Sequence, residues 1–292
     1  MKLIARIAAG LVVAVIVLSA GGWLYLRTVM YKEPVFETTP PAIPTAFGAD
    51  GRPAVVAFSK TNGFRHNSIP ACIEAVEDLA RKNEWTVFVT ESGAVFAPEI
   101  LERTNVVVSC SASGDNLTDE QESALREWIE GGGGFVGIHG AGGDPSYEWD
   151  WYVDTLIGAQ FSGHTMNPQF PEATIVVEDR GHPATQHLPP TWTRAEEWYS
   201  FEESPRAQGV RVLATVDEGT YEPEMFYFFD LSMGDHPIIW SQCVGDGRSF
   251  YSALGHQPSA FAEPLHLKLL DGAIAWAAGI AGEDCGQIAA AH

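Results

Sequence analysis

Three histidines each come shortly after the end of a different apolar run: His66, His139 and His256. In open α/β sheets, the carboxyl ends of the parallel strands meet at one edge, and ligands bind there. An imidazole changes charge near neutral pH, so it can act as a base, an acid or a metal ligand. The spacing therefore predicts one site built from histidines that lie far apart in the sequence.

The sharpest local signal is the stretch Gly137-Ile138-His139-Gly140-Ala141. Small residues flank a single large side chain at a strand-to-helix turn, which is the layout of a nucleophile elbow. A histidine at that position suits proton transfer or metal binding better than acyl transfer. The alternative is a buried histidine that caps the sheet.

The elements that must position these residues alternate between strand and helix. The apolar runs 54–58, 85–89, 105–109 and 135–138 predict strands, and the amphipathic stretches 68–82 and 118–130 predict helices. Such alternation predicts a doubly wound, mostly parallel sheet in an α/β fold. Further along, the sequence predicts strands at 173–177, 210–216, 237–244 and 248–253, and a last helix at 264–278.

Composition excludes some classes of partner. The net charge is −21, which disfavours nucleic acid because little here neutralises phosphates. No G-x-G-x-x-G follows a strand, so no nucleotide cofactor is expected. The four cysteines, Cys72, Cys110, Cys243 and Cys285, form no C-x-x-C motif and are expected to be buried thiols. A disulfide is the alternative if the domain is exported, but spacing assigns no pairing.

The amino terminus has the length and composition of a membrane anchor. Residues 3–26 are almost entirely apolar, which is enough to span a bilayer. A cleaved signal peptide is the rival interpretation. We expect an anchor at 1–32, a proline-rich linker at 33–53, one domain at 54–282 on the extracytoplasmic (periplasmic) side, and a disordered tail at 283–292. Oligomeric state is open.

Many short motifs, in order, resemble one known family. They are Asn62–Ile69, Gly137-Ile138-His139, Trp151-Tyr152, Leu156–Ala159, Phe161–His164, Glu196–Tyr199, His236–Trp240 and Gly247–His256. The chain is similar, over about residues 53–280, to the ThuA-like family named for trehalose utilisation. The resemblance implies a flavodoxin-like fold of the class I glutamine amidotransferase type and a carbohydrate substrate, such as a disaccharide or its 3-keto derivative.

Two departures bear on mechanism. His139 stands at the position of the amidotransferase nucleophilic cysteine, so thioester chemistry is disfavoured. The family's usual Asp-Glu pair reads Glu196-Glu197, with the second carboxylate retained. A hydrolase, lyase or isomerase would use His139 and His256 for proton transfer, with Glu197 orienting one of them or acting as base.

The expected substrate-binding residues flank these groups. Asn62, Arg65, His66 and His164 would bind hydroxyls, and Trp151 or Trp198 would stack on a sugar ring. A second interpretation adds a divalent metal such as zinc on His66, His139, His164, His256 and Glu197, which are suitable ligand types without a diagnostic spacing.

A non-enzymatic function is the alternative. A membrane-tethered domain that binds or senses carbohydrate without turnover would use the same polar rim. The other histidines, His182, His187, His236 and His266, are expected to be structural.

Overall fold

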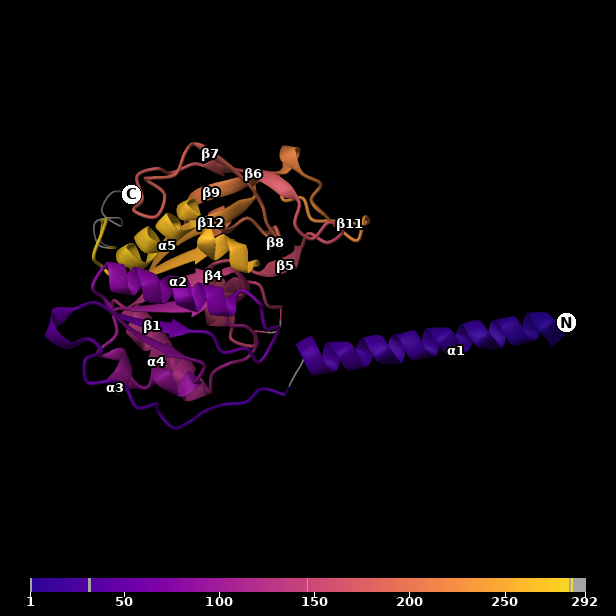
Figure 1. The fold of residues 1–292 in the computed structure, drawn as a ribbon, viewed down its shortest axis with the longest axis horizontal. Helices are drawn as coiled ribbons and strands as arrows, with labels where there is room; N and C mark the ends of the chain where they lie inside the picture. The colour runs from indigo at the N-terminus through magenta and orange to yellow at the C-terminus, as the bar shows by residue number, and fades with distance from the viewer. Residues whose placement is uncertain (1, 31–32, 146, 284, 286–292) are drawn as a thin grey trace.

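The protein is described here by a computed structural model, which covers residues 2–30, 33–145, 147–283 and 285. Its centre is a nine-stranded sheet with the order β2-β1-β3-β4-β13-β12-β9-β6-β7 (Figure 1). One apolar core cluster of buried residues extends through both halves of this sheet.

The first half of the sheet is parallel. Its strands are β2 (Thr86–Thr90), β1 (Ala54–Phe58), β3 (Val106–Cys110), β4 (Gly134–Ile138) and β13 (Gly247–Ser252). Each pairs in parallel with its neighbour in the sheet. Strands β1, β3 and β4 are fully buried, as their apolar composition predicts. This order, 2-1-3-4-5 when the strands are counted along the chain, is the flavodoxin-like order that the sequence predicted.

The second half of the sheet is antiparallel, so the expectation of a mostly parallel sheet is corrected. Its strands are β12 (Pro237–Val244), β9 (Arg211–Asp217), β6 (Glu172–Val177) and β7 (Thr191–Ala195). Strand β12 pairs with β13 across a short turn at Gly245 and Asp246, and so short a connection permits only an antiparallel pair. Strands β9, β6 and β7 continue the antiparallel pairing.

Helices cover the parallel half. The elements are α2 (Ile69–Lys82), α3 (Pro98–Leu101), α4 (Asp119–Glu130) and α5 (Pro264–Ala277). Helices α2 and α5 lie side by side (Figure 1), and Lys82 on α2 pairs with Asp271 on α5 at 2.7 Å. The capping box that begins α4 is present between Thr118 and Gln121.

Two small sheets lie beyond the edge at which the parallel strands end. Strand β5 (Phe161–His164) pairs with β8 (Tyr199–Phe201), and β10 (Glu224–Met225) pairs with β11 (Phe229–Asp230). An isolated bridge between Met166 and Met225 joins the two sheets. The sequence analysis identified none of these four strands.

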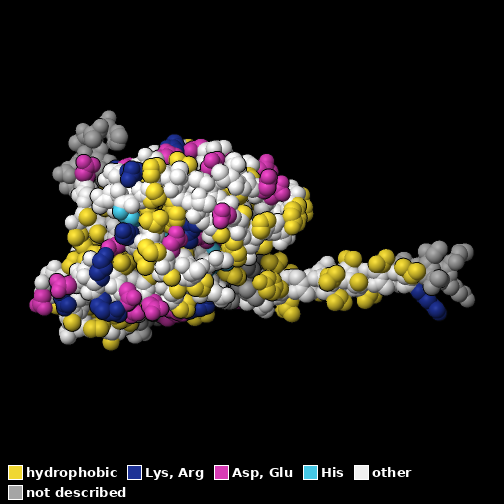
Figure 2. All heavy atoms as spheres, turned by 45° about the horizontal axis from the view of Figure 1, so that its top comes forward, with side chains coloured by type: hydrophobic (Ala, Val, Ile, Leu, Met, Phe, Trp, Pro, Cys, Tyr) yellow, Lys and Arg dark blue, Asp and Glu magenta, His cyan; other side chains and the backbone are white. Residues whose placement is uncertain are grey.

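The amino-terminal helix α1 (Lys2–Tyr25) projects from the domain (Figure 1), and hydrophobic side chains cover its surface (Figure 2). The stretch Gly10–Thr28 is long and apolar enough to cross a membrane, and a signal sequence would have the same character. The turns that follow form a short π-helix, Leu26–Met30.

The proline-rich stretch 33–53 lies against the domain. Phe47 is 2% exposed and packs on Phe88, and Arg103 donates to three carbonyls of the stretch. Glu37 forms an ion pair with the buried Lys60. These contacts attach the linker to the domain surface.

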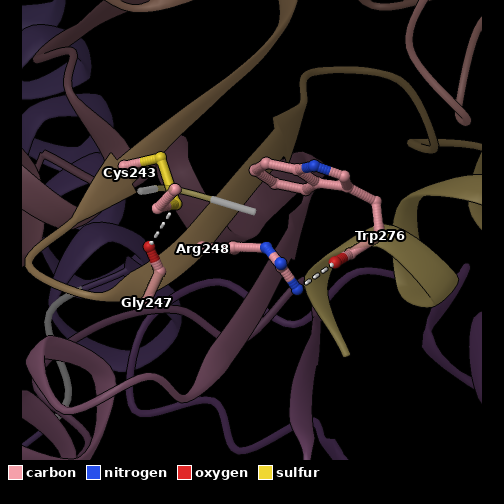
Figure 3. Close-up of a disulfide and its surroundings, with 5 residues drawn as sticks. Cys243, Gly247, Arg248 and Trp276 are labelled. Carbon is pink, nitrogen blue, oxygen red and sulfur yellow. Dashed lines mark hydrogen bonds between the residues drawn. A yellow bond between two sulfur atoms is a disulfide. The ribbon is translucent and has the colours of Figure 1, made fainter. Parts of the chain in front are cut away.

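All four cysteines are paired, so the expectation of buried thiols is corrected. Cys72 on α2 bonds Cys110 at the end of β3, and Cys243 on β12 bonds Cys285. The partners lie 38 and 42 residues apart, and only the fold brings them together. Near the second disulfide, Arg248 donates to the carbonyl of Trp276 (Figure 3). Of the tail expected at 283–292, residues 284 and 286–292 lie outside the described residues.

Candidate functional site

Three histidines and one carboxylate converge at the carboxyl end of the parallel strands. One ligand-type atom from each of His66, His139, Glu197 and His256 lies within 4.8 Å of every other. The three histidines follow β1, β4 and β13, whereas Glu197 comes from the segment between β7 and β8. The convergence of the three histidines is what their positions after strands predicted.

His139 lies at the centre of this group and is fully buried. Its φ of 49° is in the left-handed region, which confirms the sharp turn expected after β4. Its Nδ1 lies 2.7 Å from the carbonyl of Ala253, which can only accept, so Nδ1 carries a proton. Nε2 therefore accepts a hydrogen bond from the hydroxyl of Tyr199 at 2.8 Å. Neighbouring Gly140 has no room for a side chain, because a Cβ there would lie 2.7 Å from the His66 ring.

Glu197 joins the histidines electrostatically. Its Oε2 lies 2.8 Å from Nδ1 of His256 and 3.4 Å from Nε2 of His139. Burial by itself opposes ionisation of this carboxyl, but its contacts with the imidazoles of His139 and His256 outweigh burial and hold the pKa of Glu197 below its ordinary value. Glu197 is therefore an anion at neutral pH, and it orients His256 with Nδ1 protonated.

His66 completes the group as a neutral ring. Its centroid lies 4.8 Å from that of His139 and 5.1 Å from that of His256. Burial, together with the neighbouring His139 and His256, lowers the pKa of His66 to about 2. Its Nδ1 is buried without a hydrogen-bond partner among the described residues. A metal ion or a substrate group could use a buried imidazole nitrogen that has no protein partner.

Glu196 holds the loop that carries His256. It accepts from the backbone N–H groups of Gly255 at 3.0 Å and His256 at 3.2 Å, and Arg194 pairs with it at 2.9 Å. The two adjacent glutamates thus have different tasks. Glu196 fixes the backbone of the His256 loop, and Glu197 contacts the imidazoles.

The group opens to solvent on the side of His164 and His256, whose side chains are 26% and 18% exposed. His164 is outside the set of four, but its Nδ1 lies 3.1 Å from Oε1 of Glu197. Gln169 donates to the same oxygen at 2.6 Å. Phe170 stands beside His256 with ring centroids 5.1 Å apart.

Four residues expected to bind substrate make their contacts elsewhere. The Asn62 side chain bonds the backbone of Val35 and Asp115, and Arg65 pairs with Glu91 at 2.6 Å. Trp151 packs on Trp149. Trp198 is 1% exposed and donates to the carbonyl of Pro171, so neither face of its ring is open.

Four residues of the site were not predicted from the sequence: Tyr199, Glu196, Gln169 and Phe170. Tyr199 and Glu196 stood inside a quoted motif, and that motif was their signal. Gln169 and Phe170 follow an unrecognised strand, and no pattern marked them.

The other histidines have packing contacts. His182 accepts from the N–H of Ala184, and His266 lies near Arg194. His236 bonds Glu218 through Nδ1 and the backbone carbonyl of Tyr199 through Nε2, each at 2.8 Å, so it supports the strand that carries Tyr199. His187 is half-buried.

The donor set fits a divalent transition metal. Imidazole nitrogens with one carboxylate are the ligands of catalytic zinc and of related ions. His139 already has its second nitrogen fixed by a backbone carbonyl, as metal-ligating histidines usually do. His66, His139, His256 and Glu197 would hold such an ion.

Comparison with known proteins agrees with this architecture. The family model ThuA, described as trehalose utilisation, matches residues 54–277. A putative ThuA-like protein from Bacteroides uniformis has a similar structure, with a TM-score of 0.66, 22% identity and coverage of 85% of this chain and 97% of that one. Another from Parabacteroides merdae has a TM-score of 0.59, 18% identity and coverage of 79% and 91%. No curated protein matches the chain.

Proposed function

We propose that this chain is an enzyme that transfers protons on a disaccharide, a glycoside or a 3-keto derivative of one. The chain belongs to the ThuA family, whose description is trehalose utilisation. The observation that carries the proposal is the contact of His139, His256 and Glu197 at the open end of the parallel strands. Membership of the family supports a role related to sugars, and the site supplies the chemistry.

The hydrogen bonds assign a task to each group. Nε2 of His139 carries the lone pair and is the base that takes a proton from a sugar hydroxyl or from a carbon next to a keto group. His256 is partly exposed and has its Nδ1 proton directed at Glu197, so when its Nε2 is protonated as well, the imidazolium gives that Nε2 proton to the departing oxygen and returns to the neutral ring. The anionic Glu197 stabilises whichever imidazole becomes charged. This arrangement suits a lyase, hydrolase or isomerase.

In the alternative form of the proposal, a divalent metal on His66, His139, His256 and Glu197 would supply Lewis acidity toward a carbonyl or hydroxyl oxygen of the substrate, and His139 would then be a ligand instead of the base. The orphaned Nδ1 of His66 supports this alternative form. Elemental analysis of protein purified without a histidine tag tests it. Stoichiometric zinc, manganese or another divalent ion is expected, with loss of activity on chelation. Metal-free protein that is active in chelator would remove the metal and leave the acid–base proposal standing.

The experiment for the reaction is a substrate panel. The full chain in detergent is incubated with disaccharides, simple glycosides and their 3-keto forms, and products are identified by mass spectrometry. Turnover that is lost in His139→Gln, with sugar binding retained by calorimetry, is expected. Binding without any turnover in the wild type would instead make the protein a membrane-tethered carbohydrate-binding or sensing domain.

We also propose that α1 stays as a membrane anchor and that the domain is extracytoplasmic. Support comes from the exposed apolar surface of α1 and from the two disulfides, because such bonds persist in oxidising compartments. Detection of the intact amino terminus in the membrane fraction, with the domain open to external protease, tests both statements. A mature chain that begins after residue 20 would mean a cleaved signal peptide.

A further inference from the structure

The hairpin formed by β10 and β11 carries four consecutive aromatic residues at its tip. Phe226, Tyr227, Phe228 and Phe229 are 42%, 71%, 73% and 50% exposed. Phe226 and Tyr227 have φ values of 56° and 66°, a region that bulky side chains seldom occupy. The turn therefore holds large apolar side chains in solvent at a conformational cost. Single apolar residues are common on protein surfaces, but four adjacent ones form a contiguous patch.

This aromatic tip, residues 226–229, lies at the same edge of the domain as the histidine site. Met225 bridges Met166, and the N–H of Phe226 donates to the carbonyl of Met166 at 3.1 Å. Met166 lies two residues after His164, which contacts Glu197. The hairpin thus flanks the opening of the site.

The chain also leaves toward the membrane from this edge. Val35 bonds the side chain of Asn62, and Asn62 lies in the loop between β1 and His66. Four residues lie between Met30, at the end of the apolar helical segment, and Val35, and the five extended steps from one to the other span at most roughly 18 Å. The edge that bears the site is therefore held close to any bilayer that α1 enters. Figure 1 shows β11 and the base of α1 on the same side of the domain, and hydrophobic side chains gather on that side in Figure 2.

We propose that the aromatic tip is a second membrane contact, which inserts into the bilayer interface and holds the opening of the histidine site toward the lipid surface. The inference rests on the proposed anchoring by α1. Aromatic side chains partition into the interfacial region of bilayers, and tyrosine is enriched there. Glu224 and Asp230 flank the tip and stay in water, so the insertion is shallow and favours zwitterionic over anionic lipid.

The experiment measures immersion depth at single labelled positions. The native cysteines are all paired, so one added cysteine takes up a nitroxide label selectively. The full chain is placed in phosphatidylcholine nanodiscs, and electron paramagnetic resonance compares collisions with apolar oxygen and with a water-soluble nickel complex. The hairpin variants are Tyr227→Cys and, separately, Phe228→Cys. Leu18→Cys on α1 reports the anchor. Asp246→Cys, exposed in the β12–β13 turn at the opposite end of β13, is the matched control.

We expect both hairpin labels to collide more with oxygen than with the nickel complex, with an oxygen-to-nickel collision ratio between those of the Leu18 and Asp246 labels. This ratio should fall in nanodiscs of anionic lipid. Hairpin labels that match the Asp246 label while the Leu18 label is immersed would overturn the inference and leave the anchor standing. A Leu18 label open to nickel would overturn the anchor, and the inference with it. Hairpin labels shielded by added sugar, but not by lipid, would also overturn the inference, because the tip would then be part of the sugar site.

Discussion

The two halves of the sheet contribute different parts of the site. The parallel half supplies the three imidazoles His66, His139 and His256 at the ends of β1, β4 and β13. The antiparallel half and the small sheet beside it supply Glu197 and Tyr199. The parallel half places nitrogen atoms that can exchange protons, and the other half supplies the charge and the hydroxyl that fix their protonation states. Proton donors and acceptors from two unlike scaffolds thus meet at one edge.

Removing the charge of Glu197 is the most direct way to break this division of tasks. Glu197→Gln keeps the size of the side chain but leaves His256 without an anionic partner. Turnover should fall by about 10²–10⁴-fold, the usual contribution of a positioned acid or base. Steady-state kinetics on the substrate found in the panel provide the measurement. Glu263→Gln, which removes a 30% exposed carboxylate that also pairs with Arg194, is the control and should stay near wild type. Full activity in Glu197→Gln would mean that the antiparallel half is only a scaffold.

This division also explains how far the sequence could be interpreted. The buried strands β1, β3 and β4 are short, continuous apolar runs, so periodicity identified them, and the parallel-sheet rule placed His66, His139 and His256 at one edge. Glu197 was found only through the family motif. Its position depends on β8, a strand of three residues that pairs with β5 from a distant part of the chain. Strands this short carry no periodic signal.

Trp198 and Asn62 are the opposite case, because both were predicted as site residues and both make other contacts in the structure. Both were expected to bind sugar because of their residue type, yet Trp198 is buried in the core and Asn62 bonds the linker. Residue type indicates what a side chain could bind, but burial and the direction of the side chain are tertiary properties. The disulfide partners were unpredictable for the same reason.

The two disulfides allow the halves to be compared by stability. Replacement of Cys72 and Cys110 by alanine opens a 38-residue loop, for which chain entropy gives a loss of about 4 kcal/mol in the free energy of unfolding. The matched pair, Cys243 and Cys285, spans 42 residues but should cost less, because the segment after α5 that it ties down buries little apolar surface at Ile280, which is 48% exposed. Denaturant unfolding of both double variants measures the difference. Equal losses would show that the carboxyl-terminal segment is an integral part of the core.

Two buried tyrosines sharpen the comparison at His139 itself. Tyr199, on β8, donates to the Nε2 atom of His139, whereas Tyr251, on β13, donates to its backbone carbonyl at 2.8 Å. Tyr199→Phe should lower kcat roughly fivefold with KM unchanged, since one hydrogen bond of about 1 kcal/mol orients the base without touching substrate. Tyr251→Phe is the matched control, and we expect it to lower stability with a smaller effect on kcat. A KM effect in Tyr199→Phe would place its hydroxyl in contact with the substrate.

The smallest effect concerns a histidine outside the site, in the antiparallel half. Burial, together with the nearby Arg211, lowers the pKa of His182 to about 3, against a pKa near 6.5 in the unfolded chain. Below pH 6.5 the unfolded state therefore takes up a proton that the folded state does not, so stability falls with pH down to about 3. The slope is about 1.4 kcal/mol per pH unit, and above pH 6.5 there is no contribution.

His182→Gln should therefore flatten the dependence of unfolding free energy on pH between 6 and 4 by about that slope, in denaturant titrations at each pH. Burial also lowers the pKa of His187, but this side chain is half-buried, so His187→Gln should flatten the same curve by less. If both variants kept the full slope of the wild type, the acid sensitivity of the domain would have to arise from the edge of the parallel half, where His66 is held neutral.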